Sequence, residues 1–149
     1  MKSLSILFIS VCLFTANFIL AQDKSDKKKT GDMTVVITGI ENNKGNIQIG
    51  LFNSEDSYKG KKKKFKGAVI KVENEKVIWE LKDIPYGNYA IKAFHDENGD
   101  DKINTNFLGI PTEKYGFSNN PSVFFGAPGY SKTKFVFDKV DEKIEIKLK

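Results

Sequence analysis

The fold is indicated most directly by residues 83–91, which read Asp-Ile-Pro-Tyr-Gly-Asn-Tyr-Ala-Ile. The Gly-x-Tyr within this stretch places Tyr89 at the start of a strand, two residues before the inward-pointing position of Ile91. β-Sandwich domains often use a tyrosine there, because its hydroxyl can bond to backbone just upstream and hold the corner. We therefore predict that Tyr89 ties this corner. The open alternative is a tyrosine that only packs at the start of a strand.

Short stretches that alternate or are rich in β-branched residues recur on both sides of this corner, separated by turns. In residues 47–51 and 144–148, apolar side chains alternate with polar ones or glycine, as in strands with one face on a core and the other in water. No stretch keeps a helical period for three turns. The predicted strands are Met33–Ile40, Asn46–Phe52, Ala68–Glu73, Lys76–Leu81, Asn88–His95, Lys132–Phe137 and Lys143–Leu148.

These strands predict an all-β fold, a two-layer antiparallel β-sandwich that is immunoglobulin-like or transthyretin-like. Asn74-Glu75, between two β-rich stretches, predicts a tight hairpin turn. Asp96–Ser131 is one long, loop-rich connection of roughly 36 residues, which is unusual in a compact domain unless it is functional or has structure of its own. Within it, Val123–Phe125 could form a short strand. We expect the connection to fold over one end of the sandwich.

The first 21 residues have the layout of a secretory signal peptide. A single early positive charge at Lys2 precedes an apolar stretch, Leu4–Leu20, and the small residue Ala21 follows it. The apolar stretch is nearly long enough to span a bilayer, but no basic stop-transfer cluster comes directly after it. We therefore predict cleavage after Ala21, export to the periplasm, the outer surface or the medium, and no transmembrane span in the processed protein.

Cys12, the one cysteine of the sequence, lies inside this apolar stretch rather than after a small residue at its end, so lipid attachment is not expected. The processed chain would then hold no thiol, which excludes disulfides, thiolate metal sites and cysteine nucleophiles. Residues 22–32 are polar and charged and predict a disordered spacer. Residues 33–149 form the predicted single domain.

The charge pattern argues against a nucleic-acid partner. The chain has a formal net charge of +5, and its basic residues are all lysines. The bidentate guanidinium forks that recognise phosphate and guanine are therefore missing.

The sharpest chemical pattern is an acidic loop, Asp96–Asn106, that opens the long connection. Oxygen ligands at alternate positions match the first nine positions of an EF-hand-type calcium loop. Two positions depart from that pattern: Asp101 stands where glycine is usual, and Phe107 where a bidentate glutamate is usual. The predicted calcium ligands are the side chains of Asp96, Asn98, Asp100 and Asn104 and the carbonyl of Lys102, with His95 and Glu113 as supporting residues.

Calcium would relieve the repulsion among four acids that crowd within six residues, namely Asp96, Glu97, Asp100 and Asp101. Without the bidentate glutamate, we expect a dissociation constant of roughly 10⁻⁴ to 10⁻³ M. The open alternative is a turn in which these side chains cap backbone amides and no metal binds.

No constellation in the sequence predicts an enzyme. His95 is the only histidine, and a hydrolase would need a nucleophile and an orienting group around it. Residues 116–120 lack the second glycine of a nucleophile elbow. No spacing favours a pair of catalytic carboxylates. We therefore expect a non-enzymatic module.

A second candidate surface is the lysine-rich loop Lys59–Lys66, which would attract acidic glycans or lipids of the cell envelope. The alternative is a solvated loop without a partner. Tyr58 and Phe65 flank the lysines and could dip into such a surface, whereas Trp79 is expected to pack in the core or on a sheet face.

The stretch from His95 to Asn120, HDENGDDKINTNFLGIPTEKYGFSNN, resembles a family of small exported bacterial proteins that is known only as domain of unknown function 2141. The resemblance implies a secreted, β-rich domain with no established activity, substrate or catalytic residue. That family commonly has Asn-Gly where Asp100-Asp101 stand and aspartate where Asn104 stands, so charge is redistributed within this loop. Outside the loop, the resemblance takes in Pro85, Gly87, Tyr89, Ala90 and Pro128.

Overall fold

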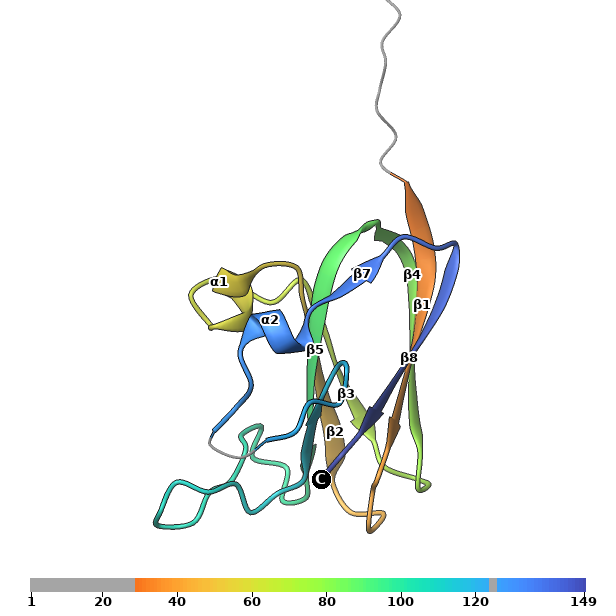
Figure 1. Ribbon diagram of the computed structural model, residues 1–149. Coiled ribbons are helices and arrows are strands. Elements are labelled where there is room, and N and C mark those ends of the chain that lie inside the picture. The colour runs from red at the N-terminus through yellow and green to blue at the C-terminus, as the bar shows by residue number, and fades with distance from the viewer. Residues whose placement is uncertain (1–28, 124–125) are drawn as a thin grey trace, which may run out of the picture.

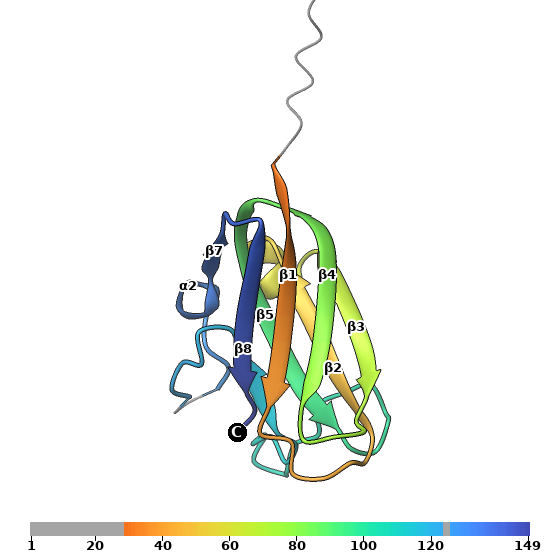
Figure 2. The same ribbon diagram turned by 90° about the vertical axis from the view of Figure 1, so that its right-hand side faces the viewer.

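Two β-sheets face each other in the computed structural model, which describes residues 29–123 and 126–149 (Figures 1 and 2). The predicted signal peptide and residues 22–28 of the predicted spacer lie outside this part of the chain. Within it, no helix is long and apolar enough to cross a membrane. The elements, in chain order, are β1 (Thr30–Thr38), β2 (Asn46–Phe52), α1 (Glu55–Tyr58), β3 (Lys66–Lys71), β4 (Val77–Pro85), β5 (Gly87–Asp96), β6 (Tyr115–Phe117), α2 (Tyr130–Thr133), β7 (Phe135–Phe137) and β8 (Asp141–Lys147).

The smaller sheet has the strand order β4-β1-β8, and the larger one has the order β3-β2-β5-β6, with β7 also paired to β5. Alternation along the strands explains the two layers, because every second side chain of β1, β2 and β5 points into the space between the sheets. The all-β, two-layer sandwich is thus confirmed. The largest fully buried side chains of this core include Met33, Ile37, Ile47, Ile49, Leu51, Ile91, Phe137 and Ile146. Trp79 packs against the same core, as expected.

One strand pair departs from the antiparallel pattern. β8 runs parallel to β1, with Asp32 opposite Asp141 and Thr38 opposite Lys147. The reason lies in how the chain reaches β8. β7 pairs with the first residues of β5, and only residues 138–140 separate it from β8, so β8 starts at the same end of the molecule as β1.

The corner at Tyr89 forms as predicted. The Tyr89 hydroxyl donates a 2.7 Å hydrogen bond to the Pro85 carbonyl, four residues upstream. Its ring is buried and lies beside those of Phe65, Phe135 and Phe137. The hydroxyl therefore holds the sharp turn that carries the chain from β4 in one sheet to β5 in the other.

Two predicted features near the middle and the start of the domain are wrong. Asn74-Glu75 does not close a hairpin, because β3 and β4 belong to different sheets and the buried residues Val72 and Val77 carry the chain across. Residues 30–32 are not spacer but the start of β1. They pair with the end of β4, and the Asp32 carboxylate accepts a 2.7 Å hydrogen bond from Lys82.

The second half of the domain also differs from prediction. The predicted strand Lys132–Phe137 is helical in its first half, where the Thr133 hydroxyl donates to the Tyr130 carbonyl, and only Phe135–Phe137 is extended. The long connection contains an unpredicted strand, β6, which pairs with β5. Of the possible strand Val123–Phe125, the last two residues lie outside the described part.

Candidate functional site

The outer face of the larger sheet carries several aromatic side chains where a solvent-facing surface would be mostly polar. Phe94 of β5 lies between Gln48 of β2 and Tyr115 of β6, and one row further along the strands Lys92 lies between Gly50 and Phe117. All of these side chains point away from the core, since they alternate with buried core residues. A sheet with one wet face normally carries polar residues in these positions. The sequence of the strands therefore provides a second apolar surface, outside the sandwich core.

The two short helices cover one end of this surface. Tyr58 of α1 and Tyr130 of α2 join a small apolar cluster with Ala90 and Phe117 on the sheet. Figure 1 shows α1 and α2 on the side of the larger sheet that faces away from β1, β4 and β8. The rest of the outer face stays open below the helices.

This open part is a groove of about 1000 Å³. Its floor is the outer face of β2, β5 and β6, and its wall is the long connection after β5. On the floor β2 and β3 place two glycines opposite each other, Gly50 and Gly67, and the Phe52 ring and the Lys64 side chain lie over them. The residues that line the groove include Gln48, Gly50, Phe52, Lys64, Lys92, Phe94, Asp101, Ile103, Leu108, Ile110, Pro111, Tyr115, Phe117 and Val123.

The wall of the groove exposes apolar side chains to solvent. Leu108 is 66% exposed and Ile110 is 55% exposed, although both line the groove. Asn106 builds the turn that presents them: its side-chain oxygen accepts hydrogen bonds from the amides of Leu108 and Ile110, at 2.9 and 3.1 Å. The turn is closed again by the Asn106 amide, which donates to the Ile110 carbonyl. The apolar wall is thus held in place by a defined turn.

Lys92 is a half-buried cation in this groove, which is lined mostly by apolar and aromatic side chains. Its ammonium donates a 2.7 Å hydrogen bond to the Tyr58 carbonyl and lies 3.8 Å from the centre of the Tyr58 ring and 5.3 Å from that of Phe52. It makes no ion pair with any residue that the structure describes. Burial lowers the pKa of Lys92. Within the described residues, aromatic faces and one carbonyl thus stabilise this charge, without a carboxylate.

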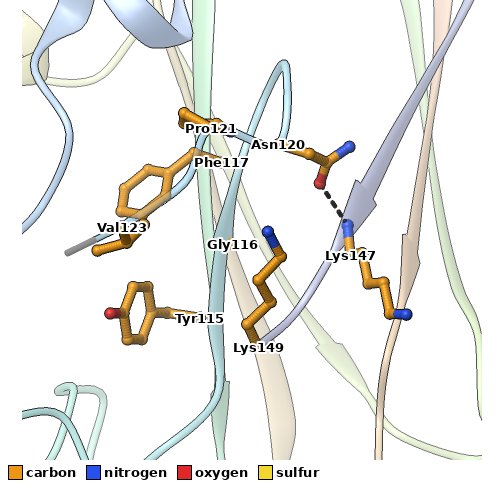
Figure 3. A pocket seen from close by; sticks show the side chains of 8 residues that line it. All are labelled: Tyr115, Gly116, Phe117, Asn120, Pro121, Val123, Lys147 and Lys149. Atoms are coloured by element: carbon orange, nitrogen blue, oxygen red, sulfur yellow. Dashed lines mark hydrogen bonds between the residues drawn. The ribbon is translucent and has the colours of Figure 1, made fainter.

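A smaller pocket of about 120 Å³ adjoins the groove on the other side of β6. Figure 3 shows the rings of Tyr115 and Phe117, with Val123, on one side of this strand and Lys147 and Lys149 on the other. The Lys147 amide donates a 2.8 Å hydrogen bond to the Asn120 side chain, which fixes the pocket's edge. Because Tyr115 and Phe117 border both spaces, this pocket extends the aromatic surface of the groove.

Sequence reasoning missed this groove. The predicted strand Asn88–His95 does not by itself reveal that its outward-facing residues form an apolar surface with those of β2 and β6. The signal was present, since the run Tyr-Ala-Ile-Lys-Ala-Phe over residues 89–94 is apolar on both faces apart from Lys92. Such runs are typical of strands covered on both sides.

The predicted calcium loop is organised around the Asp96 carboxylate, which is fully buried. One of its oxygens accepts hydrogen bonds from the amides of Gly99 and Asp100, at 2.7 and 3.2 Å. The other accepts from the Asp101 amide at 2.9 Å and the Gln48 side chain at 3.3 Å. Burial alone would raise the pKa of Asp96, but these hydrogen bonds outweigh it and lower the pKa.

Glu113 braces the same loop from its far end. Its two carboxylate oxygens accept hydrogen bonds from the Glu97 amide at 3.0 Å and from the Asn104 amide at 2.8 Å. Glu113 is buried, unlike most acids of this surface. Glu113 thus reaches back to the loop, and the contacts that the structure shows are with backbone amides, while its role beside a calcium ion stays a prediction.

The other predicted ligands are exposed or half-buried in the same loop. The Asp100 carboxylate accepts from the Lys102 amide at 2.9 Å, and the Asn98 side chain accepts from the Asp100 amide at 3.2 Å. Asp101 adopts the left-handed conformation that its position requires, with φ 63°. In the described ranges, no three His, Cys, Asp or Glu side chains form a metal-binding group. Calcium binding by this loop stays a prediction.

His95 lies on the core side of β5 and is fully buried. Its Nε2 lies 2.7 Å from the Lys44 carbonyl, and its Nδ1 lies 3.9 Å from the Glu97 carboxylate. The ring therefore links the end of β5 to the connection between β1 and β2.

The lysine-rich loop is partly neutralised by α1. Lys59 lies 2.6 Å from the Glu55 carboxylate, and Lys62 lies 3.4 Å from that of Asp56. Lys64 turns toward the groove, where its side chain lies over Gly67. The flanking aromatics do not face outward as envisaged: Tyr58 is buried and Phe65 packs against the core. They contact the rings of the domain instead, at centroid distances of 5.5–5.7 Å.

Comparison with known families adds one match. Residues 35–145 match the model of a family described as an uncharacterized protein conserved in bacteria, DUF2141. No curated protein and no solved structure matches the chain.

Proposed function

The chain belongs to this family of uncharacterized bacterial proteins, DUF2141. We propose that it is an exported, non-enzymatic module that binds a small apolar ligand in the groove on the outer face of its larger sheet. The proposal is supported by the side chains on the outer face of the larger sheet. This face carries aromatic side chains along β5 and β6 and is walled by two apolar residues that remain mostly exposed. Ligand sites are typically concave and mostly apolar, with a few polar groups, and enclose about 300–1,000 Å³.

A ligand would bury the groove wall. Covering the side chain of Leu108 or Ile110 contributes about 1.5–3 kcal/mol when burial is complete. The turn at Asn106 already holds both side chains in place, so little ordering of the protein opposes binding.

The test uses an uncharged fluorescent probe, N-phenyl-1-naphthylamine, whose emission rises on entering apolar surroundings. We expect saturable binding to the full domain and a loss of at least about tenfold in affinity for Leu108→Asp combined with Ile110→Asp. Phe107→Asp is the matched control: Phe107 stands on the same turn and is 95% exposed, but it does not line the groove. Equal probe binding by all three proteins would show that the groove is not the site.

Export is proposed from the first 21 residues, with their early lysine, apolar stretch and terminal alanine. We expect mass spectrometry of the protein from its bacterial host to find an N-terminus near Gln22. An intact Met1, or a lipid on Cys12, would contradict this proposal.

A further inference from the structure

Lys92 is the half-buried cation of the groove, and its position indicates which ligand the groove fits. Lys92 lies one row of the sheet beyond Phe94, on the side of the helices. The apolar wall of Ile103, Leu108 and Ile110 belongs to the connection that leaves the opposite end of β5. A ligand that lies along the strands would therefore meet a cation near one end and aliphatic side chains near the other.

Lys92 has hydrogen-bonding capacity left. An ammonium has three N–H donors, and the structure shows one of them used, by the Tyr58 carbonyl. The aromatic faces of Tyr58 and Phe52 stabilise the charge without occupying a donor. Because no described carboxylate pairs with Lys92, an anionic group on the ligand would supply the missing partner.

Charge at the other end of the groove fixes the direction of an anionic ligand. Asp101 lines the groove beside Gln48, whose side-chain amide donates to it at 2.5 Å. A negative group placed there would be repelled, whereas at Lys92 it would be attracted, with the exposed Lys64 at the same rim.

The backbone around the groove argues against a peptide. β2 and β5 are hydrogen-bonded on both sides, and the amide and carbonyl of Tyr115 in β6 bond to Lys149. A peptide in the groove would thus bury amide groups without partners, at a cost of about 1–3 kcal/mol each. A hydrocarbon chain carries no such groups.

We infer that the groove binds a long-chain carboxylic acid, with its carboxylate on the Lys92 ammonium and its hydrocarbon chain over Phe94 and Tyr115 toward Leu108 and Ile110. This inference rests on the proposed function and adds the chemical class and orientation of the ligand. A carboxylate is favoured over a phosphate group because the half-buried cation of the groove is a single ammonium, rather than an arginine fork or a lysine cluster.

The experiment displaces the neutral probe from the full domain at pH 7 with tetradecanoic acid, tetradecan-1-ol and tetradecyl phosphate, each below its aggregation limit. We expect the acid to bind about tenfold tighter than the alcohol, the size of one charge-assisted hydrogen bond. In Lys92→Met the acid should lose this advantage while the alcohol keeps its affinity. Lys71→Met is the matched control, because Lys71 lies on the same sheet face outside the groove, and it should keep the preference for the acid.

The outcomes separate the two proposals. Probe binding with equal affinities for acid and alcohol overturns the carboxylate inference and leaves the groove as the site. A phosphate that binds tighter than the acid also overturns it. Absence of probe binding overturns the proposed function itself. If circular dichroism shows that Lys92→Met does not fold, the comparison of acid with alcohol on the unaltered protein decides alone.

Discussion

Lys92 shows how one residue gives a sheet face a chemical preference. Around its ammonium, β2 supplies Gly50 and the ring of Phe52, and α1 supplies the ring and the carbonyl of Tyr58, so no side-chain carboxylate of the described residues balances its charge. Burial disfavours the charged form and lowers the pKa of this lysine. A carboxylate beside it would act in the opposite direction.

This gives a pH dependence of binding. Acid binding requires the protonated lysine, so its affinity should fall at alkaline pH, and it should do so before an ordinary exposed lysine titrates, because the pKa of Lys92 is lowered. Displacement titrations between pH 7 and 11 would measure this, with the alcohol as the control that stays constant. In Lys92→Arg, which keeps its charge, the fall should disappear. A fall that persists in the arginine variant would assign the effect to another group.

Substitutions at Asp96 and Asp100 distinguish the two roles of the acidic loop, a calcium site and a hydrogen-bonded turn. Asp96→Ala should cost about 1.5–3 kcal/mol in the presence of EDTA, because the buried carboxylate accepts hydrogen bonds from three amides and one side chain. Asp100→Ala, at an exposed position, should cost little. Thermal and urea unfolding would measure both.

The calcium prediction is then tested on Asp100. If the loop binds calcium with the expected affinity, about 100-fold excess calcium should stabilise the unaltered protein by about 2.7 kcal/mol. Asp100→Ala should lose most of that gain. A melting temperature that calcium leaves unchanged would contradict calcium binding and leave the loop as a hydrogen-bonded turn.

At this scale, sequence patterns pick out the acidic loop as a local unit but not the groove. The alternation of Asp96, Asn98 and Asp100 identified a real local unit, because side chains that suit a metal also suit backbone amides. The direction of each carboxylate depends on contacts such as that of Gln48, 48 positions earlier in the chain, which spacing does not contain. In the sequence Lys92 is one outward-facing strand residue, because the aromatic rings beside it, Phe52 and Tyr58, come from much earlier in the chain.

At the scale of elements, the corner at Tyr89 is the clearest link between sequence and fold. The Tyr89→Phe change removes only the hydroxyl and its hydrogen bond to Pro85, so we expect a loss of about 0.5–1.5 kcal/mol in the free energy of unfolding in urea. Tyr86→Phe is a suitable control, since within the described residues the Tyr86 hydroxyl makes no hydrogen bond. Probe binding should be unchanged in both variants. An equal loss in both would mean that the corner bond adds nothing specific.

Elements with several alternating residues were predictable, and the short ones were not. β2 coincides with its predicted bounds because Ile47, Ile49 and Leu51 alternate so regularly. β6 has only three residues and depends on pairing with β5, so its own sequence carries little signal. The connection between β3 and β4 was equally hard to predict, because a turn-like sequence there links strands of different sheets.

At the scale of the whole molecule, the net positive charge bears on whether the lysine-rich loop binds acidic glycans. Lys61, Lys63 and Lys66 make no ion pair in the described part of the chain, whereas Lys59 and Lys62 are paired. If the loop binds acidic glycans, changing the unpaired three to glutamine should abolish retention on immobilised heparin at low salt. Changing the paired two should have a smaller effect. Retention that does not weaken between about 0.05 and 0.5 M salt would contradict an electrostatic surface.

The parallel pairing of β1 with β8 has a consequence for the newborn chain. The Thr38 hydroxyl bonds to the Ile146 carbonyl, 108 residues further along. Ribosomes add about 5–20 residues per second, so β8 is completed about 5–20 s after β1. Throughout that interval one edge of β1 has no neighbour, and such edges invite wrong partners. The smaller sheet can therefore close only once the last strand is available, and until then β1 offers an open edge to other chains.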